Sequence, residues 1–352
     1  MKTSLEQTHQ PPYRQSRGDV RTLFVNGSTT QLGYRVAQRL HQHPQVRLTH
    51  RASMIPLEFT HGDMLVSTAA AQQLVAWLRA EQVDTLIHLD VIGEDAPTTN
   101  REAALQHNVM GTLTLLGACA AASVRRVIVR SSTLVYGARA NHPAFISEDT
   151  PVQKARKSGL LRDYCELDAL TQSFAHSHPQ MEVVILRCAS IVGDQAWSPL
   201  TAYLTQRTPP ILIGYSPRIQ VLHPDDAADA VVQAALGDAC GCFNLAALEP
   251  IPLDQAIRLT GRQPRGVLPI PIALAGALGQ RRQLTGWFAD LEFLVYSCVA
   301  DLRRAMHSLG WQPRHNAYDL LRGLATLHAA PRATPPRTLL LPESPDGERA
   351  RD

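Results

Sequence analysis

The sequence predicts an α/β fold in which a doubly wound parallel sheet carries a smaller, mixed C-terminal region. Between residues 21 and 195, short apolar segments alternate with longer amphipathic ones, as in parallel strands joined by right-handed helical crossovers. The first apolar segment, 22–26, runs directly into a turn with glycines and then into a helix. After residue 195, prolines separate short strands and helices, which indicates a mixed region built onto the sheet.

The individual elements follow from the spacing of apolar residues. In the helix expected at 32–43, Val36, Ala37 and Leu40 share one face, as an amphipathic helix requires. The strands expected in the sheet are 22–26, 45–50, 57–60, 85–89, 127–130 and 183–187, and the helices are 32–43, 69–82, 102–122 and 161–177. In the C-terminal region we expect strands at 211–213, 219–222 and 242–245 and helices at 225–236, 254–260, 286–298 and 317–327.

Composition divides the chain into four segments. Residues 1–20 and 331–352 are polar, contain prolines and are expected to be disordered tails. Residues 21–195 form the predicted sheet domain, and residues 196–330 form the smaller region of the same extended unit. Because such a region lies across the ends of the strands, we expect it to shape a pocket for a small-molecule substrate.

The composition also excludes several classes of function. Lysine and arginine nearly balance the acidic residues, 34 against 31, whereas nucleic-acid-binding proteins are far more basic. The first twenty residues lack the apolar core of a signal peptide, and the longest apolar run, 268–278, is shorter than a membrane span. The six cysteines and 14 histidines show no metal-ligand spacing. We therefore expect a cytoplasmic protein that does not span a membrane, bind nucleic acid or hold a metal.

The turn after the first strand has the features of a dinucleotide site. Gly27 and Gly33 fit the outer positions of a G-x-x-G-x-x-G turn, in which glycines let the backbone approach a pyrophosphate at the helix N-terminus. Leu32 belongs to the same turn. Thr30 stands at the middle position, where its side chain would crowd the phosphates although its hydroxyl could bond one. A turn of this kind also occurs for packing alone.

Further motifs follow this turn in a fixed order. They are Gly62-Asp63-Met64, His88-Leu89-Asp90, 108–112 (NVMGT), 131–137 (SSTLVYG), Leu186-Arg187, 191–193 (IVG), 223–226 (HPDD), 243–245 (FNL) and 309–313 (LGWQP). In this order and spacing, residues 21–328 resemble the NAD-dependent epimerase/dehydratase family, the extended short-chain dehydrogenases/reductases. More narrowly, residues 123–137, 181–193 and 218–226 resemble bacterial UDP-glucose 4-epimerases.

The resemblance implies a Rossmann-type sheet, a bound NAD or NADP, a nucleotide-sugar substrate and a homodimer. It also implies that Ser132 polarises the substrate oxygen and that Tyr164 is the acid/base, with the nicotinamide taking or giving hydride. The cofactor-binding positions implied are Gly27, Thr30, Leu32, Gly33, Arg51, Asp63, Met64, Leu89, Asp90, Asn108 and Ser131.

The sequence departs from the family pattern at the catalytic lysine. The family places a lysine four residues after the tyrosine, where it lowers the tyrosine pKa and bonds the nicotinamide ribose; here that residue is Asp168. A carboxylate there would raise the pKa of Tyr164 instead, although it could accept a bond from a ribose hydroxyl. Asp90 stands where the family has a small residue, and Arg130 is a candidate ion-pair partner for it.

Two further positions bear on the reaction and the cofactor. Thr133 and Leu134 replace the acidic pair of the dehydratases, so sugar dehydration is not expected. His50 and Arg51 replace the acidic residue that would accept the adenosine ribose hydroxyls of NAD. Arg51 would suit the 2′-phosphate of NADP, and an ordinary surface arginine explains it equally well.

Two functions therefore remain open. The first is an NAD(P)-dependent nucleotide-sugar epimerase or reductase with an altered active site. The alternative is a non-catalytic relative that keeps the fold as a cofactor-sensing or protein-interaction module. Asp168, Asp90 and Thr30 favour the second, whereas the retained Ser132, Tyr164, Asn108 and Gly33 favour the first.

Overall fold

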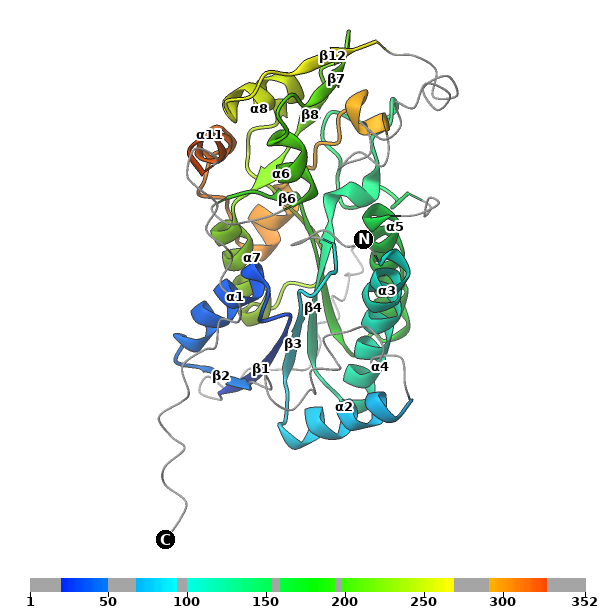
Figure 1. The fold of residues 1–352 in the computed structure, drawn as a ribbon. Coiled ribbons are helices and arrows are strands. Elements are labelled where there is room, and N and C mark those ends of the chain that lie inside the picture. Colours follow the sequence, from blue (N-terminus) through cyan, green and yellow to red (C-terminus); the bar gives the residue numbers. More distant parts are fainter. Residues whose placement is uncertain are drawn as a thin grey trace, which may run out of the picture.

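A parallel sheet forms the centre of the molecule in the computed structural model (Figure 1). The structure describes residues 20–49, 68–93, 100–153, 159–193, 198–268 and 291–327. Six strands of the described chain lie in the order β10-β5-β4-β3-β1-β2, and all neighbours are parallel. Their bounds are β1 Arg21–Asn26, β2 Val46–Thr49, β3 Thr85–His88, β4 Arg126–Ser132, β5 Glu182–Cys188 and β10 Gly241–Leu245. The predicted doubly wound parallel sheet is confirmed.

The direction of winding reverses at β1, which places a crevice at the carboxyl ends of the strands. From β1 the chain crosses to β2 on one side and then returns to β3 on the other. In open α/β sheets, ligands bind at such a switch point, outside the carboxyl ends of the strands. Candidate residues after β1, β3 and β4 therefore share one edge of the sheet. The strand expected at 57–60 lies outside the described residues.

Helices cover both faces of the sheet (Figure 1). On one face, α1 (Gln31–His41) and α7 (Pro224–Leu236) pack over a core that includes Val36, Leu40 and Val231. On the other face, α2 (Thr68–Ala80), α4 (Thr112–Ala122) and α5 (Leu160–Ser177) enclose a second core. Because both faces of the sheet are buried, its strands have nearly continuous apolar sequences.

The helix expected at 102–122 contains a segment of wider turns. It begins as α3 (Arg101–Leu105), continues as the π-helix η2 (Gln106–Gly111) and ends as α4. Short π segments inside helices are common at functional sites, because the extra residue redirects the side chains. Here the π segment carries His107 and Asn108, both of which are buried and reach the carboxyl edge of the sheet.

The C-terminal region is a third apolar core surrounded by short elements. Helix α11 (Ala317–Leu327) agrees with its predicted range, whereas the single strand expected at 219–222 is wrong, because Gln220 separates two strands with different partners. The helix expected at 286–298 is also wrong within its described part, which is one 3₁₀ turn followed by a turn and irregular chain. The other elements are β6 Ser190–Ile191, α6 Pro199–Leu204, β7 Pro210–Leu212, β8 Arg218–Ile219, β9 Val221–Leu222, β11 Ile251–Pro252, α8 Leu253–Leu259, β12 Arg265–Val267, η4 Leu291–Leu294 and η5 Ala305–Leu309.

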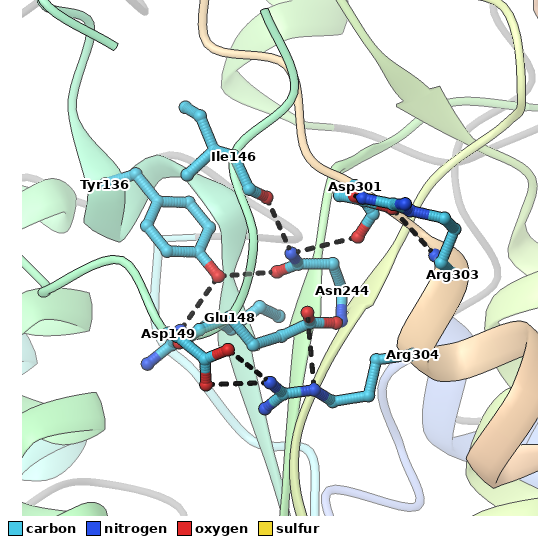
Figure 2. A network of polar contacts seen from close by, with 9 residues as sticks. Tyr136, Ile146, Glu148, Asp149, Asn244, Asp301, Arg303 and Arg304 are labelled. Carbon is cyan, nitrogen blue, oxygen red and sulfur yellow. Dashed lines mark hydrogen bonds and ion pairs between the residues drawn. The ribbon is translucent and has the colours of Figure 1, made fainter. Parts of the chain in front are cut away.

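A buried polar network ties the chain after β4 to β10 and to the C-terminal region (Figure 2). The side-chain amide of Asn244 donates to the carbonyl oxygens of Ile146 and Asp301, both at 3.1 Å, and the backbone N–H of Asn244 donates to Glu148 Oε1 at 2.9 Å. Burial raises the pKa of the Glu148 carboxyl group. Because each polar group has a partner, this network holds the C-terminal region against the sheet. Within the described chain, no helix is both long and apolar enough to span a membrane.

Candidate active site

The turn between β1 and α1 brings two glycines into direct contact. Gly27 has a φ of +89°, and a Cβ atom at Gly33 would lie 1.9 Å from the carbonyl oxygen of Gly27. No side chain fits at Gly33 without moving the backbone of Gly27. This close packing of helix against strand is the arrangement through which backbone N–H groups face an anion at a helix N-terminus.

Thr30 is the N-cap residue of α1. Its Oγ1 donates to the carbonyl oxygen of Gly27 at 2.8 Å and accepts from the N–H of Gly33 at 3.0 Å. This cap explains why a threonine stands at the position where a glycine was expected, because its side chain accepts from one of the free N–H groups of the helix. The Thr30 hydroxyl already has two partners within the turn. The hydrogen bond from this hydroxyl to a phosphate, which the sequence allowed, would therefore have to replace one of them.

Replacing Thr30 with valine tests this cap. Valine keeps the shape of threonine but removes Oγ1, so we expect the free energy of unfolding to fall by about 1 kcal/mol. Urea denaturation measures the change, and Thr30→Ser, which retains the hydroxyl, serves as the matched control. A valine variant as stable as the wild type would show that the cap does not stabilise α1.

Asp90, directly after β3, lies against the same turn. A Cβ atom at Gly27 would stand 2.8 Å from the backbone nitrogen of Asp90 and 3.0 Å from its Cβ. The carboxylate lies 3.1 Å from Nε2 of His107, a hydrogen-bond partner that we did not predict, and the charge of Arg130, the predicted partner, also acts on it. Burial alone would raise the pKa of Asp90, but the hydrogen bond from His107 and the positive charge of Arg130 outweigh it and lower the pKa. An ionised carboxylate therefore borders the turn.

His88 lies at the end of β3 and is buried beneath this loop. Thr112 Oγ1 donates to the carbonyl oxygen of Asn108 at 2.6 Å, so it accepts from His88 Nε2 at 2.9 Å. The amide of Asn26 then donates to His88 Nδ1 at 2.8 Å. These partners assign the neutral, Nε2-protonated tautomer, and burial lowers the pKa of His88 to about 4.

Asn108 connects the loop after β3 to α5. Its Oδ1 accepts from the N–H of Ile92 at 2.8 Å, and its Nδ2 donates to the Ile92 carbonyl oxygen at 3.0 Å. Nδ2 also donates to Asp163 Oδ2 at 2.9 Å, and Arg101 forms an ion pair with that oxygen at 2.6 Å. Asn108 therefore fixes the loop that carries Asp90 relative to the helix that carries Tyr164, a positioning role.

Asp168, at the position of the family lysine, forms a buried ion pair. Its carboxylate receives Arg187 Nη2 at 2.8 Å and Arg187 Nε at 2.9 Å, and both side chains are at most 1% exposed. Ser131 Oγ donates to it at 2.6 Å and Gln172 Nε2 at 2.6 Å. Both oxygens are thus occupied by protein donors. The position therefore offers neither a cation nor a free acceptor for a ribose hydroxyl.

The two predicted catalytic residues, Ser132 and Tyr164, both precede this ion pair in the chain. Ser132 ends β4, and its Oγ accepts weakly from the N–H of Leu134 at 3.3 Å, which leaves its O–H hydrogen to donate. Tyr164 lies in the second turn of α5, and its ring is 1% exposed. The hydroxyl of Tyr164 is therefore shielded from solvent in this conformation.

A small cavity of about 20 Å³ opens directly after Ser132. Thr133 and Leu134 line it from one side, and Arg218 and Tyr296 line it from the C-terminal region. It lies between the end of β4 and the added region, where we expect the substrate pocket, and its volume suits about one water molecule.

The family assignment rests on comparison with known proteins. The sequence matches the model of the NAD-dependent epimerase/dehydratase family over residues 23–245. The chain belongs to this family. An uncharacterised protein of Mycobacterium tuberculosis (strain ATCC 25618 / H37Rv) is 30% identical over 309 residues, which cover 84% of this chain and 80% of that protein.

Solved structures of epimerases and dehydratases share the fold. UDP-glucose 4-epimerase from Thermotoga maritima, solved with UDP-glucose, matches with a TM-score of 0.61 at 17% identity and covers 88% of this chain and 98% of its own. dTDP-glucose 4,6-dehydratase from Bacillus anthracis str. Ames, solved in complex with NAD, matches with a TM-score of 0.61 at 12% identity and covers 88% and 96%. At these identities the likeness shows the Rossmann-type fold.

Most residues that the epimerase/dehydratase resemblance singled out are described. Gly27, Thr30, Leu32, Gly33 and Asp90 gather at the switch point, whereas Leu89 is fully buried and donates its N–H to the carbonyl oxygen of Asn26 at 3.0 Å. Arg51, Asp63 and Met64 lie outside the described residues.

The sequence reasoning missed three residues of this site, which are His107, Asp163 and Arg187. His107 and Asp163 directly precede the motif residues Asn108 and Tyr164, and Arg187 was noted only as part of a motif. Each is a buried charged or titratable side chain, and such a residue requires a partner. That requirement could have indicated that these three residues have partners, but it does not identify the partners.

Proposed function

We propose that this protein binds NAD or NADP at the turn between β1 and α1 and acts on the sugar of a nucleotide sugar as an epimerase or reductase with an altered active site. The contact between Gly27 and Gly33 carries the proposal, because a Cβ atom at Gly33 would lie 1.9 Å from the carbonyl oxygen of Gly27. That contact keeps the backbone open to a pyrophosphate at the N-terminus of an eleven-residue helix.

The residues present fit a dinucleotide at the switch point. Gly27 and Gly33 keep side chains out of the turn, and Asn108 fixes the loop after β3 through two hydrogen bonds to Ile92. The carboxylate of Asp90 is the feature that opposes a negatively charged ligand there. When bound, the nicotinamide supplies the hydride acceptor and donor for the reaction.

In the proposed reaction, this chain's own residues hold the substrate and move a proton. Ser132 Oγ donates its hydrogen to the substrate oxygen, while Tyr164 as the phenolate takes the proton of the sugar hydroxyl, or as the phenol returns it to the ketone. Arg218, which lines the cavity beside Ser132, supplies a cation for the diphosphate of a nucleotide sugar. Access to Tyr164 requires its neighbours to move, since its ring is buried.

The alternative function is cofactor sensing without catalysis. The Asp168–Arg187 ion pair favours it, because the position that would hold the ribose and tune the tyrosine is closed by protein donors. Turnover separates the two functions. An enzyme changes the configuration or the oxidation state of the sugar when UDP-glucose is added, and Tyr164→Phe abolishes that conversion, whereas a sensor binds the dinucleotide and leaves UDP-glucose unchanged.

Titration with NAD⁺, NADH, NADP⁺ and NADPH tests the shared claim that a dinucleotide binds. We expect at least one to bind, and we expect Gly33→Ala to weaken its binding at least about tenfold, because the added Cβ displaces Gly27. The matched control is Gly117→Ala on α4, where a Cβ meets nothing within 4 Å. Isothermal calorimetry supplies the dissociation constants. Failure of all four dinucleotides to bind the wild type would overturn the proposed function.

A further inference from the structure

The pair of Asp90 and His107 places a negative charge at the proposed dinucleotide site. Asp90 abuts Gly27, whose missing Cβ would stand 3.0 Å from the Cβ of Asp90, and its side chain is 33% exposed. A ligand that reaches the turn therefore meets this carboxylate. A pyrophosphate carries its own negative charge, and two like charges in contact repel each other strongly in a partly buried site.

His107 is held so that the pair keeps this negative charge in the free protein. Its side chain is 3% exposed, and Nε2 lies 3.1 Å from Asp90 Oδ2. Among the described residues, the buried Nδ1 of His107 has no hydrogen-bond partner. A proton on Nδ1 would be a buried donor without an acceptor, which is unfavourable, so the ring donates from Nε2 and stays neutral. The pair then carries one negative charge.

The other charged groups that face the pair do not change charge near neutral pH. His88, beneath it on β3, stays neutral because Nδ1 accepts from Asn26 and Nε2 donates to Thr112. Arg130, on β4, keeps its positive charge throughout. The proton count of this corner of the site is therefore set by Asp90 and His107 together.

We infer that dinucleotide binding takes up one proton on the Asp90–His107 pair, which cancels the negative charge that the pyrophosphate would otherwise meet. The inference rests on the proposed function, because it concerns the same site. A proton on the pair removes the repulsion while the hydrogen bond between the two side chains remains. Binding is therefore tighter at lower pH.

The test measures the affinity of the intact protein for NAD⁺ and NADH from about pH 5.5 to about pH 8 by calorimetry. Linkage to one proton limits the effect to about tenfold weaker binding for each pH unit of increase. Buffers with different ionisation enthalpies report the proton taken up directly. NADP(H) is less suitable, because its 2′-phosphate titrates near pH 6. If only NADP(H) binds, the change of affinity with pH in the Asp90→Ala variant gives the part that comes from the 2′-phosphate of the ligand.

Two variants assign the proton to the pair. Asp90→Ala introduces a small residue as in the family, and Asp90→Asn keeps the shape without the charge. We expect both to bind more tightly than the wild type at pH 8 and to lose the pH dependence. Asp319→Ala, which removes an exposed carboxylate on α11, should keep both the wild-type affinity and the wild-type slope.

The outcomes separate this inference from the proposed function. Binding by the wild type without a pH slope overturns the inference and leaves the proposed function standing. A slope that persists in both Asp90 variants also overturns it, because another group then takes the proton. If neither the wild type nor the Asp90 variants bind any dinucleotide at any pH, the proposed function fails and the inference fails with it.

Discussion

Replacing Asp168 with leucine is expected to lower the free energy of unfolding by about 3–5 kcal/mol, the usual effect of breaking a buried ion pair from one side. The substitution leaves the Arg187 guanidinium, which is 1% exposed, without the carboxylate that receives its Nε and Nη2. It also removes the acceptor of Ser131 and Gln172. A charge left alone in the interior costs far more than the lost contacts.

Urea denaturation of Asp168→Leu beside two controls checks this result. Asp319→Leu breaks an exposed pair with Arg322, in which both side chains are more than 60% exposed, and should change stability by less than about 1 kcal/mol. The double variant Asp168→Leu/Arg187→Met removes both charges and should recover most of the loss. A single variant within about 1 kcal/mol of the wild type would show that Arg187 finds other partners and that the pair does not hold the core.

This ion pair changes how the missing lysine is tested. From the sequence alone, Asp168→Lys is the natural way to restore a family active site. In the structure, that substitution places a second cation beside Arg187, whose Nη1 also donates to Tyr136 and to the carbonyl oxygen of Glu148. The double variant Asp168→Lys/Arg187→Leu is therefore the one that introduces a lysine without a buried repulsion.

The sheet and the glycine turn could be predicted because their causes are local. The alternation of apolar and helical segments requires only the chain itself, and Gly27 and Gly33 stand at fixed distances from the first strand. The partners of single charges could not be predicted in the same way. Asp168 on helix α5 meets Arg187 from strand β5, and Asp90 meets His107 from a helix, so the topology had to be known before either partner could be predicted.

The C-terminal region shows the same limit for short elements. The expected strand at 219–222 contained the right residues, but its period does not reveal that Gln220 turns away to bond the backbone of Ala300. Its Oε1 accepts from the N–H of Ala300 at 2.7 Å, as a strand neighbour would. A side chain that replaces the backbone hydrogen bonds of a strand neighbour leaves no periodic signal in the sequence. The mixed character of the region could therefore be predicted, but the pairing of its strands could not.

Acidification is expected to lower the free energy of unfolding through the protonation of His88. The unfolded chain protonates this histidine near pH 6.5, whereas burial lowers its pKa to about 4 in the folded protein. Its contribution to stability is therefore complete above about pH 6.5 and is lost as the pH falls from there towards about pH 4. The difference in pKa corresponds to about 3 kcal/mol at full protonation and to about 2 kcal/mol at pH 5.

The variant His88→Gln isolates this contribution. Glutamine does not titrate, and its amide offers an acceptor for Asn26 and a donor for Thr112, the two partners that His88 has now. Urea denaturation at about pH 7.5 and about pH 5 should show a fall in stability about 2 kcal/mol smaller in His88→Gln than in the wild type. His176→Gln, at an exposed position on α5, should leave the wild-type fall unchanged. Equal falls in all three proteins would mean that His88 is protonated in the folded state at pH 5, which its two hydrogen bonds oppose, because a protonated Nδ1 would face the amide donor of Asn26.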